Sequence, residues 1–403
     1  MIKNIVIMCD YGYIEGGAAK VAIQTALALK KYTDLNIIFV GGSGEICDEL
    51  KRSGVISYSL NEYDLLGNPS RLMAMLKGIW NKSISQKLKG IIKDLNPKET
   101  IIHIHTWTKV LSSSVFQLVN QMEFPLFLTI HDYFTVCPNG GCFNYVKNEI
   151  CELRPMSFQC LICNCDVRHY YHKMWRCIRQ FRQNQVIRKM TDIRYIFVSE
   201  FSKRQILKRY SNIQYQFILK NPIEFGNRYR VEVEKNCYFL YIGRLSEEKG
   251  VEIFCKAISE TGVKGVVIGD GKLKNSLMKQ YPDIIFTGWL AKHEMQDWID
   301  KGRCLIFPSK GYENAPLTPL EVQAYGIPCI VSSLCAAVDN ISDGVTGLAC
   351  DINSHESLNQ AIEQLKSDQY VKELSFNTFT RFEQEEHMEE KYISRLCQIY
   401  NTI

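Results

Sequence analysis

Residues 237–250 read CYFLYIGRLSEEKG, an apolar run that meets a glycine and then a cluster of charges. The run Cys237–Ile242 is rich in residues that favour β-strands, and Gly243 opens a loop after it. The stretch Glu248–Ser259 then predicts a helix. A buried strand that leads through a glycine loop into a helix is the unit from which parallel α/β sheets are built.

The same unit repeats along both halves of the chain. In the first half the predicted strands are Lys3–Met8, Leu35–Val40, Ile101–His105, Leu126–Ile130, Tyr195–Val198 and Gln216–Lys220. In the second half they are Cys237–Ile242, Val263–Ile268, Ile284–Thr287, Cys304–Pro308 and Cys329–Ser332. With helices between them, the fold class is α/β: two Rossmann-like, doubly wound domains that face each other across a cleft. Ligands of such sheets bind at the carboxyl ends of the strands.

The boundary between the two domains is predicted at Asn221-Pro222 and the charged stretch Glu224–Lys235. Residues 1–222 are assigned to an N-terminal domain, which includes a cysteine-rich loop at 133–166. Residues 223–384 are assigned to a C-terminal domain. Residues 385–403 contain an amphipathic pattern that predicts a final helix, which we expect to pack back toward the N-terminal domain.

The composition is that of a globular protein, with 46% hydrophobic and 23% charged residues among 403, enough for two domains. The net charge of +5 gives no global field of the kind that nucleic-acid binders carry, so no nucleic-acid partner is expected. No run reaches the ~18 to 20 apolar residues that cross a bilayer. The short apolar stretch Met1–Cys9 lacks the features of a signal peptide. We therefore expect a cytoplasmic protein with its 16 cysteines reduced.

The segment Gly243–Gly250 predicts a phosphate site. A glycine directly after a strand lets the backbone approach a ligand closely. Arg244 offers a planar fork of donors and Lys249 a compact charge, and both suit a diphosphate. A turn with solvated charges in front of a capped helix is the alternative for this segment alone. A second glycine turn, weak by itself, follows the next predicted strand at Gly269, Asp270 and Gly271.

Two carboxylates follow the predicted strand Cys304–Pro308. Glu313 is in the loop after this strand, and Glu321 lies inside the next predicted helix. A carboxylate in the loop can hold sugar hydroxyls, and one two turns into the helix can hold a ribose diol. The first turn of that helix, which begins near Pro316, is expected to attract phosphate. The residues expected to line the substrate there are Ala315, Pro316, Leu317 and Thr318.

Together these motifs resemble the donor site of the family-four (group 1) retaining glycosyltransferases of GT-B fold. The resemblance rests on Gly243–Gly250, Gly269–Gly271, and Glu313 with Glu321 followed by residues 324–328, AYGIP. Further matches are Gly16-Gly17 before a helix, residues 102–105 (IHIH), Ser199, and residues 343–348 (DGVTGL). It covers nearly the whole chain. Tyr325 departs from it, because the family usually has a small residue at that position.

The resemblance implies a role for each matching residue of the C-terminal domain. Arg244 and Lys249 would bind the donor diphosphate and stabilise it as it leaves, and Gly243 would let the backbone come close. Glu313 would contact the transferred sugar, and Glu321 the ribose. The departing phosphate itself would take the proton of the acceptor, so that catalysis would depend on positioning and on stabilisation of charge.

In the N-terminal domain the resemblance implies that Gly16 and Gly17 bring backbone to the diphosphate or the acceptor. His131 would reach the sugar near its anomeric carbon, and a satisfied structural histidine at a strand end is the alternative for this residue. His105 is a further candidate for the cleft. The sequence has no Asp-x-Asp motif, and no cofactor is expected for catalysis.

The predicted function is transfer of a sugar from a nucleotide-sugar donor to a glycan or lipid-linked acceptor in cell-envelope polysaccharide synthesis. Two alternatives remain. One is a nucleotide-sugar epimerase of the same architecture, which the pairs Arg244/Lys249 and Glu313/Glu321 fit less well. The other is a non-catalytic scaffold that binds nucleotide-sugars.

Six cysteines fall in the loop 133–166: Cys137, Cys142, Cys151, Cys160, Cys163 and Cys165. The pair Cys160-x-x-Cys163, together with Cys137 and Cys151, predicts four thiolate ligands for a structural zinc, with the other two as spares. A subset of the resembled family carries such a loop. The spacing between the pairs departs from that of zinc ribbons, and reduced, partly buried cysteines are the alternative.

The stretch from Cys160 to Tyr210 is strongly basic, with twelve Lys or Arg against three acids. Aromatic residues such as Tyr170, Tyr171 and Phe181 alternate with the first of these charges in a predicted helix, Val167–Met190. A basic helix with aromatics predicts peripheral contact with an anionic membrane, on the inner face of the plasma membrane. A solvated helix whose aromatics pack on the N-terminal domain is the alternative.

Overall fold

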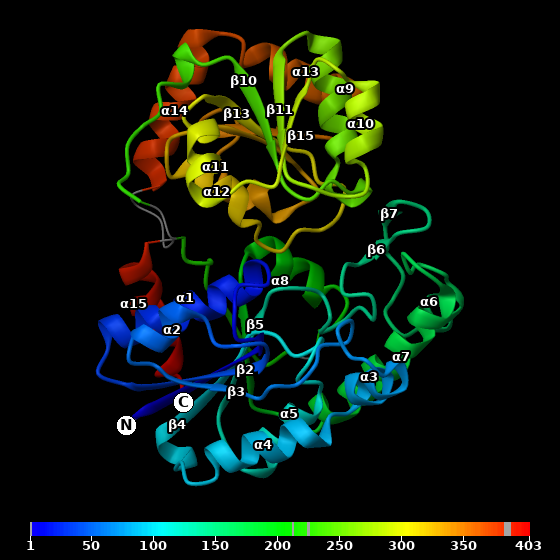
Figure 1. The fold of residues 1–403 in the computed structure, drawn as a ribbon, viewed down its shortest axis with the longest axis vertical. Helices are drawn as coiled ribbons and strands as arrows, with labels where there is room; N and C mark the ends of the chain where they lie inside the picture. The colour runs from blue at the N-terminus through cyan, green and yellow to red at the C-terminus, as the bar shows by residue number, and fades with distance from the viewer. Residues whose placement is uncertain (1, 212, 224–225, 383–387) are drawn as a thin grey trace. The chain divides into compact units, whose positions relative to one another are not determined.

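The computed structural model describes residues 2–211, 213–223, 226–382 and 388–403, which form two compact units (Figure 1). Unit 1 consists of Met1–Cys142, Glu152–Pro222 and Met388–Ile403, and unit 2 of Phe143–Cys151 and Ile223–His387. The chain thus passes into unit 2 after Pro222. Residues 224–225 of the predicted linker and 385–387 of the predicted final segment lie outside the described residues.

Unit 1 is built on a seven-stranded parallel sheet of order β3-β2-β1-β4-β5-β8-β9. Its strands are β1 (Asn4–Tyr11), β2 (Asn36–Ser43), β3 (Ile56–Ser59), β4 (Thr100–Ile104), β5 (Leu126–Ile130), β8 (Ile193–Phe197) and β9 (Tyr215–Ile218). The order of the strands reverses between β1 and β4. Such a reversal opens a crevice at the carboxyl ends of the two strands, where doubly wound sheets bind their ligands.

Helices cover both faces of this sheet. They are α1 (Gly17–Tyr32), α2 (Asp48–Arg52), α3 (Arg71–Ile79), α4 (Lys82–Ile92), α5 (Ser114–Gln121), α6 (Phe158–Ile162), α7 (Tyr170–Ile187), α8 (Glu200–Leu207) and α15 (Glu389–Tyr400). The apolar sides of α1 and α15 share one buried cluster with Ile5 and Ile7 of β1. Figure 1 shows α4 and α5 on the other side of the sheet.

Two buried hydrogen bonds attach α15 to the rest of unit 1. The hydroxyls of Thr25 and Tyr392 lie 2.8 Å apart, and the Tyr400 hydroxyl lies 2.7 Å from Nδ1 of His103. Leu396 and Ile399 of the same helix are buried against the cluster. This final helix is therefore part of the core of unit 1.

Unit 2 repeats the architecture with a six-stranded parallel sheet of order β12-β11-β10-β13-β14-β15. Its strands are β10 (Tyr238–Ile242), β11 (Lys264–Ile268), β12 (Ile285–Gly288), β13 (Gly302–Phe307), β14 (Cys329–Ser332) and β15 (Gly347–Cys350). Its helices are α9 (Val251–Thr261), α10 (Lys274–Gln280), α11 (Lys292–Ile299), α12 (Leu317–Gln323), α13 (His355–Gln364) and α14 (Asp368–Phe382). The strand order reverses between β10 and β13, so the expected ligand crevice lies at their carboxyl ends.

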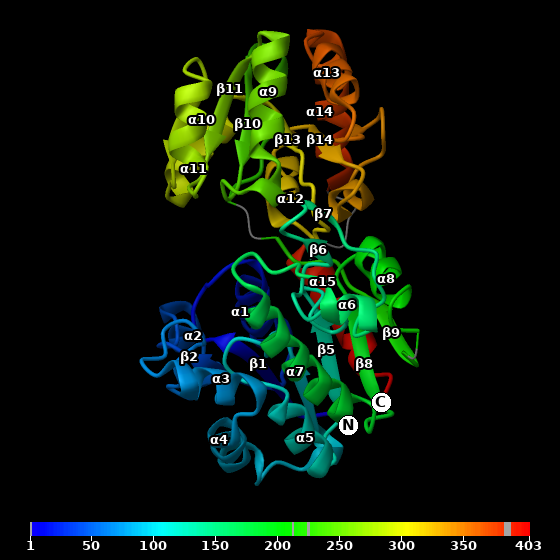
Figure 2. The same ribbon diagram turned by 90° about the vertical axis from the view of Figure 1, so that its right-hand side faces the viewer.

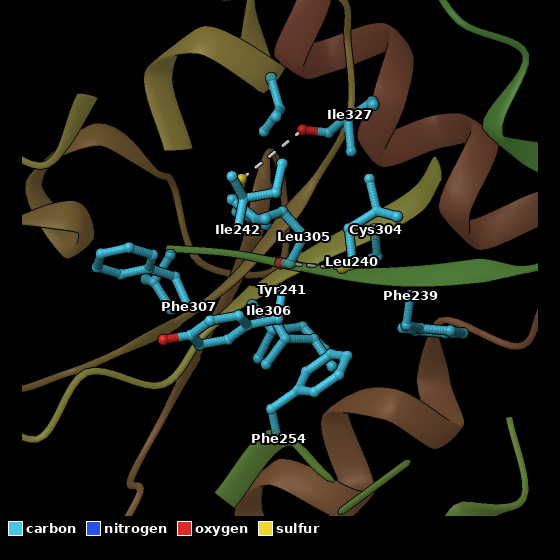
Figure 3. Close-up of a cluster of buried hydrophobic side chains, with 14 of the residues drawn as sticks. Phe239, Leu240, Tyr241, Ile242, Phe254, Cys304, Leu305, Ile306, Phe307 and Ile327 are labelled. Carbon is cyan, nitrogen blue, oxygen red and sulfur yellow. Dashed lines mark hydrogen bonds between the residues drawn. The ribbon is translucent and has the colours of Figure 1, made fainter. Parts of the chain in front are cut away.

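The core of unit 2 is formed where β10 and β13 run side by side. Figure 3 shows Phe239 and Leu240 of β10 with Leu305 and Ile306 of β13, and Phe254 of α9 beneath them. These side chains are almost fully buried. A packed core directly behind the two strand ends holds the loops that follow them in place.

The predicted α/β class with two Rossmann-like domains is confirmed. Strands Leu126–Ile130 and Cys329–Ser332 have the predicted bounds, whereas the helix predicted from Glu248 begins only at Val251. Gly250 causes this delay, since its φ of 73° ends a short 3-10 turn, η3 (Glu247–Lys249), before α9 begins. In the loop 133–166 the structure has the hairpin β6 (Phe143–Asn144) and β7 (Glu149–Ile150), and helix α6.

Candidate active site

Two loops meet at the strand reversal of unit 2. Residues 243–250 follow β10, and residues 308–316 follow β13, which pairs with β10 in parallel. The predicted residues Gly243, Arg244, Lys249 and Glu313 therefore lie at the same edge of one sheet, although 64 positions separate Lys249 from Glu313.

Main-chain contacts fix these two loops against each other. The carbonyl oxygen of Glu248 accepts hydrogen bonds from the backbone N–H of Lys310 (2.9 Å) and from the hydroxyl of Ser309 (3.2 Å). A Cβ on Gly250 would lie 1.9 Å from the carbonyl oxygen of Pro308, so only glycine allows this approach. The two loops are thus held together by a backbone hydrogen bond, by the Ser309 hydroxyl and by the close approach at Gly250.

The second glycine turn packs on the first loop. A Cβ on Gly269, whose φ is 139°, would lie 2.0 Å from the carbonyl oxygen of Gly243, and one on Gly271 would lie 2.4 Å from that of Leu245. Asp270 accepts the N–H of Leu245 with its carbonyl oxygen, at 2.9 Å. The fold itself explains these glycines, and the structure does not assign Asp270 a ligand.

Gly243 differs from these glycines. A Cβ at this position would meet no described atom closer than the Tyr241 hydroxyl, at 3.6 Å. Packing within the described protein therefore does not require glycine here. Open space beside a backbone that follows a strand is what a closely approaching ligand needs.

Lys249 and Glu313 are in direct contact. The Lys249 Nζ lies 2.5 Å from Oε1 of Glu313, which also accepts a hydrogen bond from the Ser309 hydroxyl at 3.1 Å. The two charged side chains are only 24% and 21% exposed, so solvent screens their interaction weakly. The structure thus joins the predicted phosphate-binding cation and the predicted sugar-binding carboxylate.

Arg244 extends into solvent beside this pair. Its side chain is 67% exposed and forms an ion pair with Oε1 of Glu248 at 3.0 Å. The same Glu248 oxygen accepts a hydrogen bond from the Ser246 hydroxyl at 2.7 Å. Glu248 therefore holds the guanidinium near the loop while leaving most of it accessible.

The helix after Glu313 is short. α12 begins at Leu317 with Pro316 as its N-cap and has seven residues, and Glu321 lies half-buried in its second turn. Ala315 and Thr318 are partly exposed at its start. The carbonyl oxygen of Glu313 accepts the N–H of Ala336 at 3.0 Å, which anchors the loop in front of the helix. The phosphate and ribose roles of these residues stay predictions.

Ser309 and Glu248 are site residues that the sequence reasoning did not single out. Ser309 follows directly on Pro308 at the end of a predicted strand, and its position after a strand was the available signal. Glu248 lies inside the Gly243–Gly250 segment, but its acidic charge gave no reason to connect it with a phosphate site. Ser309 donates a hydrogen bond to Glu313, and Glu248 forms an ion pair with Arg244.

In unit 1 three histidines cluster at the ends of β4 and β5. The Nδ1 of His105 lies 3.0 Å from the Nε2 of His131, with the rings stacked, and the His103 ring lies 4.3 Å from that of His105. His103 is fully buried and bonded to Tyr400 and Thr129, so its role is structural. The structure thus brings together the predicted residues His105 and His131.

All three imidazoles are neutral at pH 7. Burial lowers the pKa of His131 to about 3, and burial together with the neighbouring His131 lowers the pKa of His103 to about 3. The pKa of His105 lies well below its usual range because of burial and the two neighbouring rings. Beside them, burial raises the pKa of Asp132 to about 6. His131 can therefore offer a hydrogen bond, but it is a weak base.

Gly16 and Gly17 form the start of α1. Gly16 is the N-cap with a φ of 100°, which favours glycine, and both residues are exposed. No described atom lies within 4 Å of a Cβ placed on Gly16. The implied roles of these two glycines stay predictions.

The four predicted zinc ligands are not assembled. Lys173 donates hydrogen bonds to the carbonyl oxygens of Cys160 (2.7 Å) and Cys163 (3.1 Å) and to Sγ of Cys165 (3.2 Å), so the loop is held by an ammonium group. Cys151 ends the hairpin segment Phe143–Cys151, which belongs to unit 2. Among the described residues, no three His, Cys, Asp or Glu are placed to hold a metal ion. The arrangement does not fit zinc.

Cys137 has a different partner. It lies beside Cys142, whose thiol forms a hydrogen bond to it, and with backbone N–H groups this bond lowers the pKa of Cys137 to about 6. The backbone of Cys142 has a φ of 48°, which few residues other than glycine adopt. The loop therefore places two thiols together, one of them largely ionised at neutral pH.

Comparison with known proteins identifies the second half of the chain. Residues 236–368 match the family described as Glycosyl transferases group 1. A GDP-mannose-dependent alpha-mannosyltransferase of Corynebacterium glutamicum is 32% identical over 129 residues, 32% of this chain and 31% of that protein. The capsular polysaccharide biosynthesis glycosyltransferase CapM of Staphylococcus aureus is 25% identical over 162 residues, 36% of this chain and 41% of that protein. The chain thus matches well under half of the length of these curated relatives.

Solved structures match the whole chain. The HepE protein of Anabaena, in complex with UDP and glucose, superposes over 100% of both chains with a TM-score of 0.69 at 12% identity. A sucrose-phosphate synthase of Thermosynechococcus elongatus covers 99% of this chain, and 98% of its own, with a TM-score of 0.73 at 16% identity. At such identities the likeness concerns the fold alone. Residues 236–368 are thus similar to the group 1 glycosyl transferases, and the two Rossmann-like units have the GT-B fold.

Proposed function

We propose that this chain is a retaining glycosyltransferase that moves a sugar from a nucleotide-sugar donor to a glycan or lipid-linked acceptor in polysaccharide synthesis. The observation that carries the proposal is the contact between Lys249 and Glu313, at the sheet edge beside Gly243. It puts a cation for a diphosphate and a carboxylate for sugar hydroxyls within one hydrogen bond of each other.

In this proposal the donor diphosphate lies along the backbone of Gly243, where the described protein leaves space. Lys249 and the exposed guanidinium of Arg244 bind it. Negative charge grows on the diphosphate as its bond to the sugar breaks, and cations fixed in a partly buried site stabilise that charge without reorganising. Glu313 accepts hydrogen bonds from the sugar while it orients Lys249.

The acceptor proton goes to the departing phosphate oxygen, on the face from which the phosphate leaves. The low pKa of His131, about 3 because of burial, supports this assignment, since such an imidazole takes up a proton poorly at neutral pH. His131 acts in the proposal as a neutral hydrogen-bond partner of the sugar. Reaction on one face retains the configuration of the anomeric carbon.

The names of the relatives support the substrate class. One of them uses GDP-mannose, another acts in capsular polysaccharide biosynthesis, and an Escherichia coli relative, 26% identical over 153 residues, is a galactosyltransferase that uses UDP-Gal and a diphosphoundecaprenol acceptor. Two of these names give a nucleotide-sugar donor, and two give a polysaccharide pathway or a lipid-linked acceptor. The bases differ, so we assign none to this chain.

Thermal unfolding with UDP-, GDP- and ADP-sugars tests donor binding, because a ligand at 100 times its Kd adds about 2.7 kcal/mol to the free energy of unfolding. We expect one donor to raise the Tm of the wild type and to raise that of Lys249→Ala less. The donor found is then incubated with a lipid-linked glycan extract, and release of nucleoside diphosphate is measured.

Release that depends on the extract, with a product whose anomeric configuration by NMR equals that of the donor, is the expected result. Conversion of the donor to its epimer without release would establish the epimerase instead. Stabilisation by a donor with neither reaction would leave the scaffold. An inverted product would refute the retaining mechanism while leaving the transferase.

A further inference from the structure

Three helices of unit 1 form one continuous surface. Helices α3, α6 and α7 lie side by side in both views (Figures 1 and 2). The indole N–H of Trp175 in α7 donates to the carbonyl oxygen of Met75 in α3 at 3.0 Å, and the Tyr170 hydroxyl donates to that of Leu161 in α6 at 2.7 Å. These bonds hold the three helices together at their exposed sides.

Helix α7 exposes an apolar stripe from its first residue, Tyr170, to Phe181. The stripe consists of Tyr170, Tyr171, Met174, Ile178 and Phe181, whose exposed fractions run from 38% to 65%. Neighbouring members are mostly three or four positions apart, so they lie on one face of the helix. Leu72, Met75 and Leu76 of α3 add exposed apolar side chains beside it, and we call these eight side chains the α3/α7 surface.

The face of α7 that points into the protein is mostly polar, although Cys177, Val186 and Ile187 are also buried. Gln183 accepts a hydrogen bond from the Trp107 indole at 2.8 Å and donates one to the carbonyl oxygen of Phe134 at 2.9 Å. Arg179 donates to the carbonyl oxygen of Thr108 at 3.1 Å, and Lys173 is held by the cysteine carbonyls described above. The usual pattern of a surface helix, apolar inside and polar outside, is reversed.

Such a reversal calls for a partner that is not water. The inward polar groups are satisfied by hydrogen bonds, so they explain why that face is polar but not why the opposite face is apolar. Exposed, contiguous apolar side chains on one surface mark a site of association with a protein or a membrane. Their mixture of Tyr, Met, Leu, Ile and Phe suits insertion among lipid headgroups.

The charged residues near the α3/α7 surface favour an anionic membrane as its partner. The sequence has neither Asp nor Glu in residues 71–93, which contain α3 and α4, or in residues 167–190, which contain α7. The same two stretches contain six and seven Lys or Arg, and Arg71, Lys82 and Arg168 among them are exposed. Glu62 pairs with Lys77 of α3 at 2.6 Å and with Lys87 of α4 at 2.8 Å, but the two stretches still carry an excess of cations beside the apolar side chains. An apolar surface with an excess of cations beside it suits an anionic bilayer.

The number of cations available to lipid is smaller than the sequence alone indicates. Lys173, Arg179 and Arg194 are buried, and Arg176 forms an ion pair with the buried Asp166 at 3.0 Å. In such an attachment, apolar insertion therefore supplies more of the affinity than charge does. High salt should therefore weaken the attachment without abolishing it.

We propose that the α3/α7 surface docks this protein on an anionic lipid bilayer, with the stripe of α7 lying in the headgroup region. None of the described helices has the length and hydropathy of a membrane span. The proposal adds a partner to the proposed transferase and is argued from unit 1 only. It would bring the enzyme to a lipid-linked acceptor.

Sedimentation of the full chain with vesicles tests the docking. One set contains equal parts phosphatidylglycerol and phosphatidylcholine, and the other contains phosphatidylcholine alone. We expect stronger binding to the anionic set, reduced but not lost in 0.5 M salt. Tyr171→Gln/Ile178→Gln and Leu72→Gln/Leu76→Gln should each lower the partition coefficient about tenfold or more, because each removes two inserting apolar side chains.

The matched control replaces two exposed apolar residues of unit 2, Met278→Gln/Phe376→Gln, which are 44% and 62% exposed. It should bind vesicles as the wild type does. Light scattering without lipid measures the mass of each protein, and donor-dependent thermal stabilisation measures the donor site. All variants should be monomeric like the wild type and should keep the donor response.

Wild-type binding by both α3 and α7 variants would overturn the proposal. So would a wild-type dimer that these variants convert to monomers, since the surface would then join two copies of the chain. Vesicle binding without any donor response would leave the docking intact and count against the transferase. A donor response without vesicle binding would support the transferase and overturn the docking.

Discussion

Replacing Lys249 by alanine should damage turnover more than folding. Its Nζ contacts Glu313 at 2.5 Å, and both side chains are about four-fifths buried. A charge-assisted hydrogen bond of this kind contributes about 1.5–3 kcal/mol. Water and the Ser309 hydroxyl, 3.1 Å from the same carboxylate oxygen, would replace part of it, so we expect the free energy of unfolding to fall by about 1–2 kcal/mol. Turnover should fall ~10²–10³-fold, the usual loss for one group that stabilises developing charge.

Urea unfolding measures the first effect and donor-dependent release of nucleoside diphosphate the second. Lys256→Ala is the matched control, because this lysine of α9 pairs with Glu260 at 3.8 Å and is 44% exposed. It should change the unfolding free energy by less than about 0.5 kcal/mol and leave turnover unchanged. In Lys249→Ala/Glu313→Gln the two effects should not add. If the two losses of unfolding free energy add within about 0.5 kcal/mol, the contact is refuted. Normal turnover of Lys249→Ala would remove Lys249 from the mechanism.

Three further predictions concern single residues. Gly243→Ala should raise the Kd of the donor in a titration and change urea unfolding little. Gly269→Ala should lower the free energy of unfolding by at least about 2 kcal/mol, because Gly269 has a φ of 139° and its Cβ would lie 2.0 Å from a carbonyl oxygen. Equal unfolding free energies of the two variants would contradict the packing argument. His131 has a folded pKa of about 3 against 6.5 in the unfolded chain, so the stability tied to its neutral ring is complete above pH 6.5 and declines toward pH 3, by about 1.4 kcal/mol per pH unit. His131→Gln should therefore show a shallower loss of urea stability between pH 6.5 and 4, and an unchanged slope would mean that the ring titrates normally. Alkylation of Cys137, followed by mass spectrometry, should have a midpoint near pH 6 that rises in Cys142→Ala; a midpoint near 9 in the wild type would exclude the hydrogen bond.

The central strands could be predicted because they are continuous apolar runs. Leu126–Ile130 and Cys329–Ser332 are buried on both faces and carry few competing signals. The edge strand β3 (Ile56–Ser59) was not predicted, since its four residues are half-exposed and two of them are serine. Short edge strands take their structure from the neighbouring strand more than from their own composition.

The members of the candidate site could be predicted, but their contacts could not. Gly243, Arg244 and Lys249 stand within one short segment, and a strand before it indicates their place in the fold. The contact between Lys249 and Glu313 depends on β13 lying next to β10, which only the strand order reveals. Spacing along the chain says nothing about that order.

Two expectations from the sequence did not take the burial of cationic side chains into account. The cysteine spacing suggested four ligands around a metal, but the buried ammonium of Lys173 bonds to the carbonyls of Cys160 and Cys163 instead. The same lysine, with Arg179, was counted among the surface charges of α7. A long cationic side chain reads as solvated in a sequence, and only its hydrogen-bond partners show that it faces inward.

Helix α15 ties the order of synthesis to the order of folding. Residues 388–403 leave the ribosome only after the whole of unit 2, yet Tyr392 and Tyr400 supply buried partners for Thr25 and His103 in the part made first. Until then α1 packs on the sheet without α15, and a chaperone or the growing chain itself must shield the part of the cluster that α15 covers. A chain that stops before residue 388 would retain every strand of both sheets and still leave its first-made unit incompletely folded.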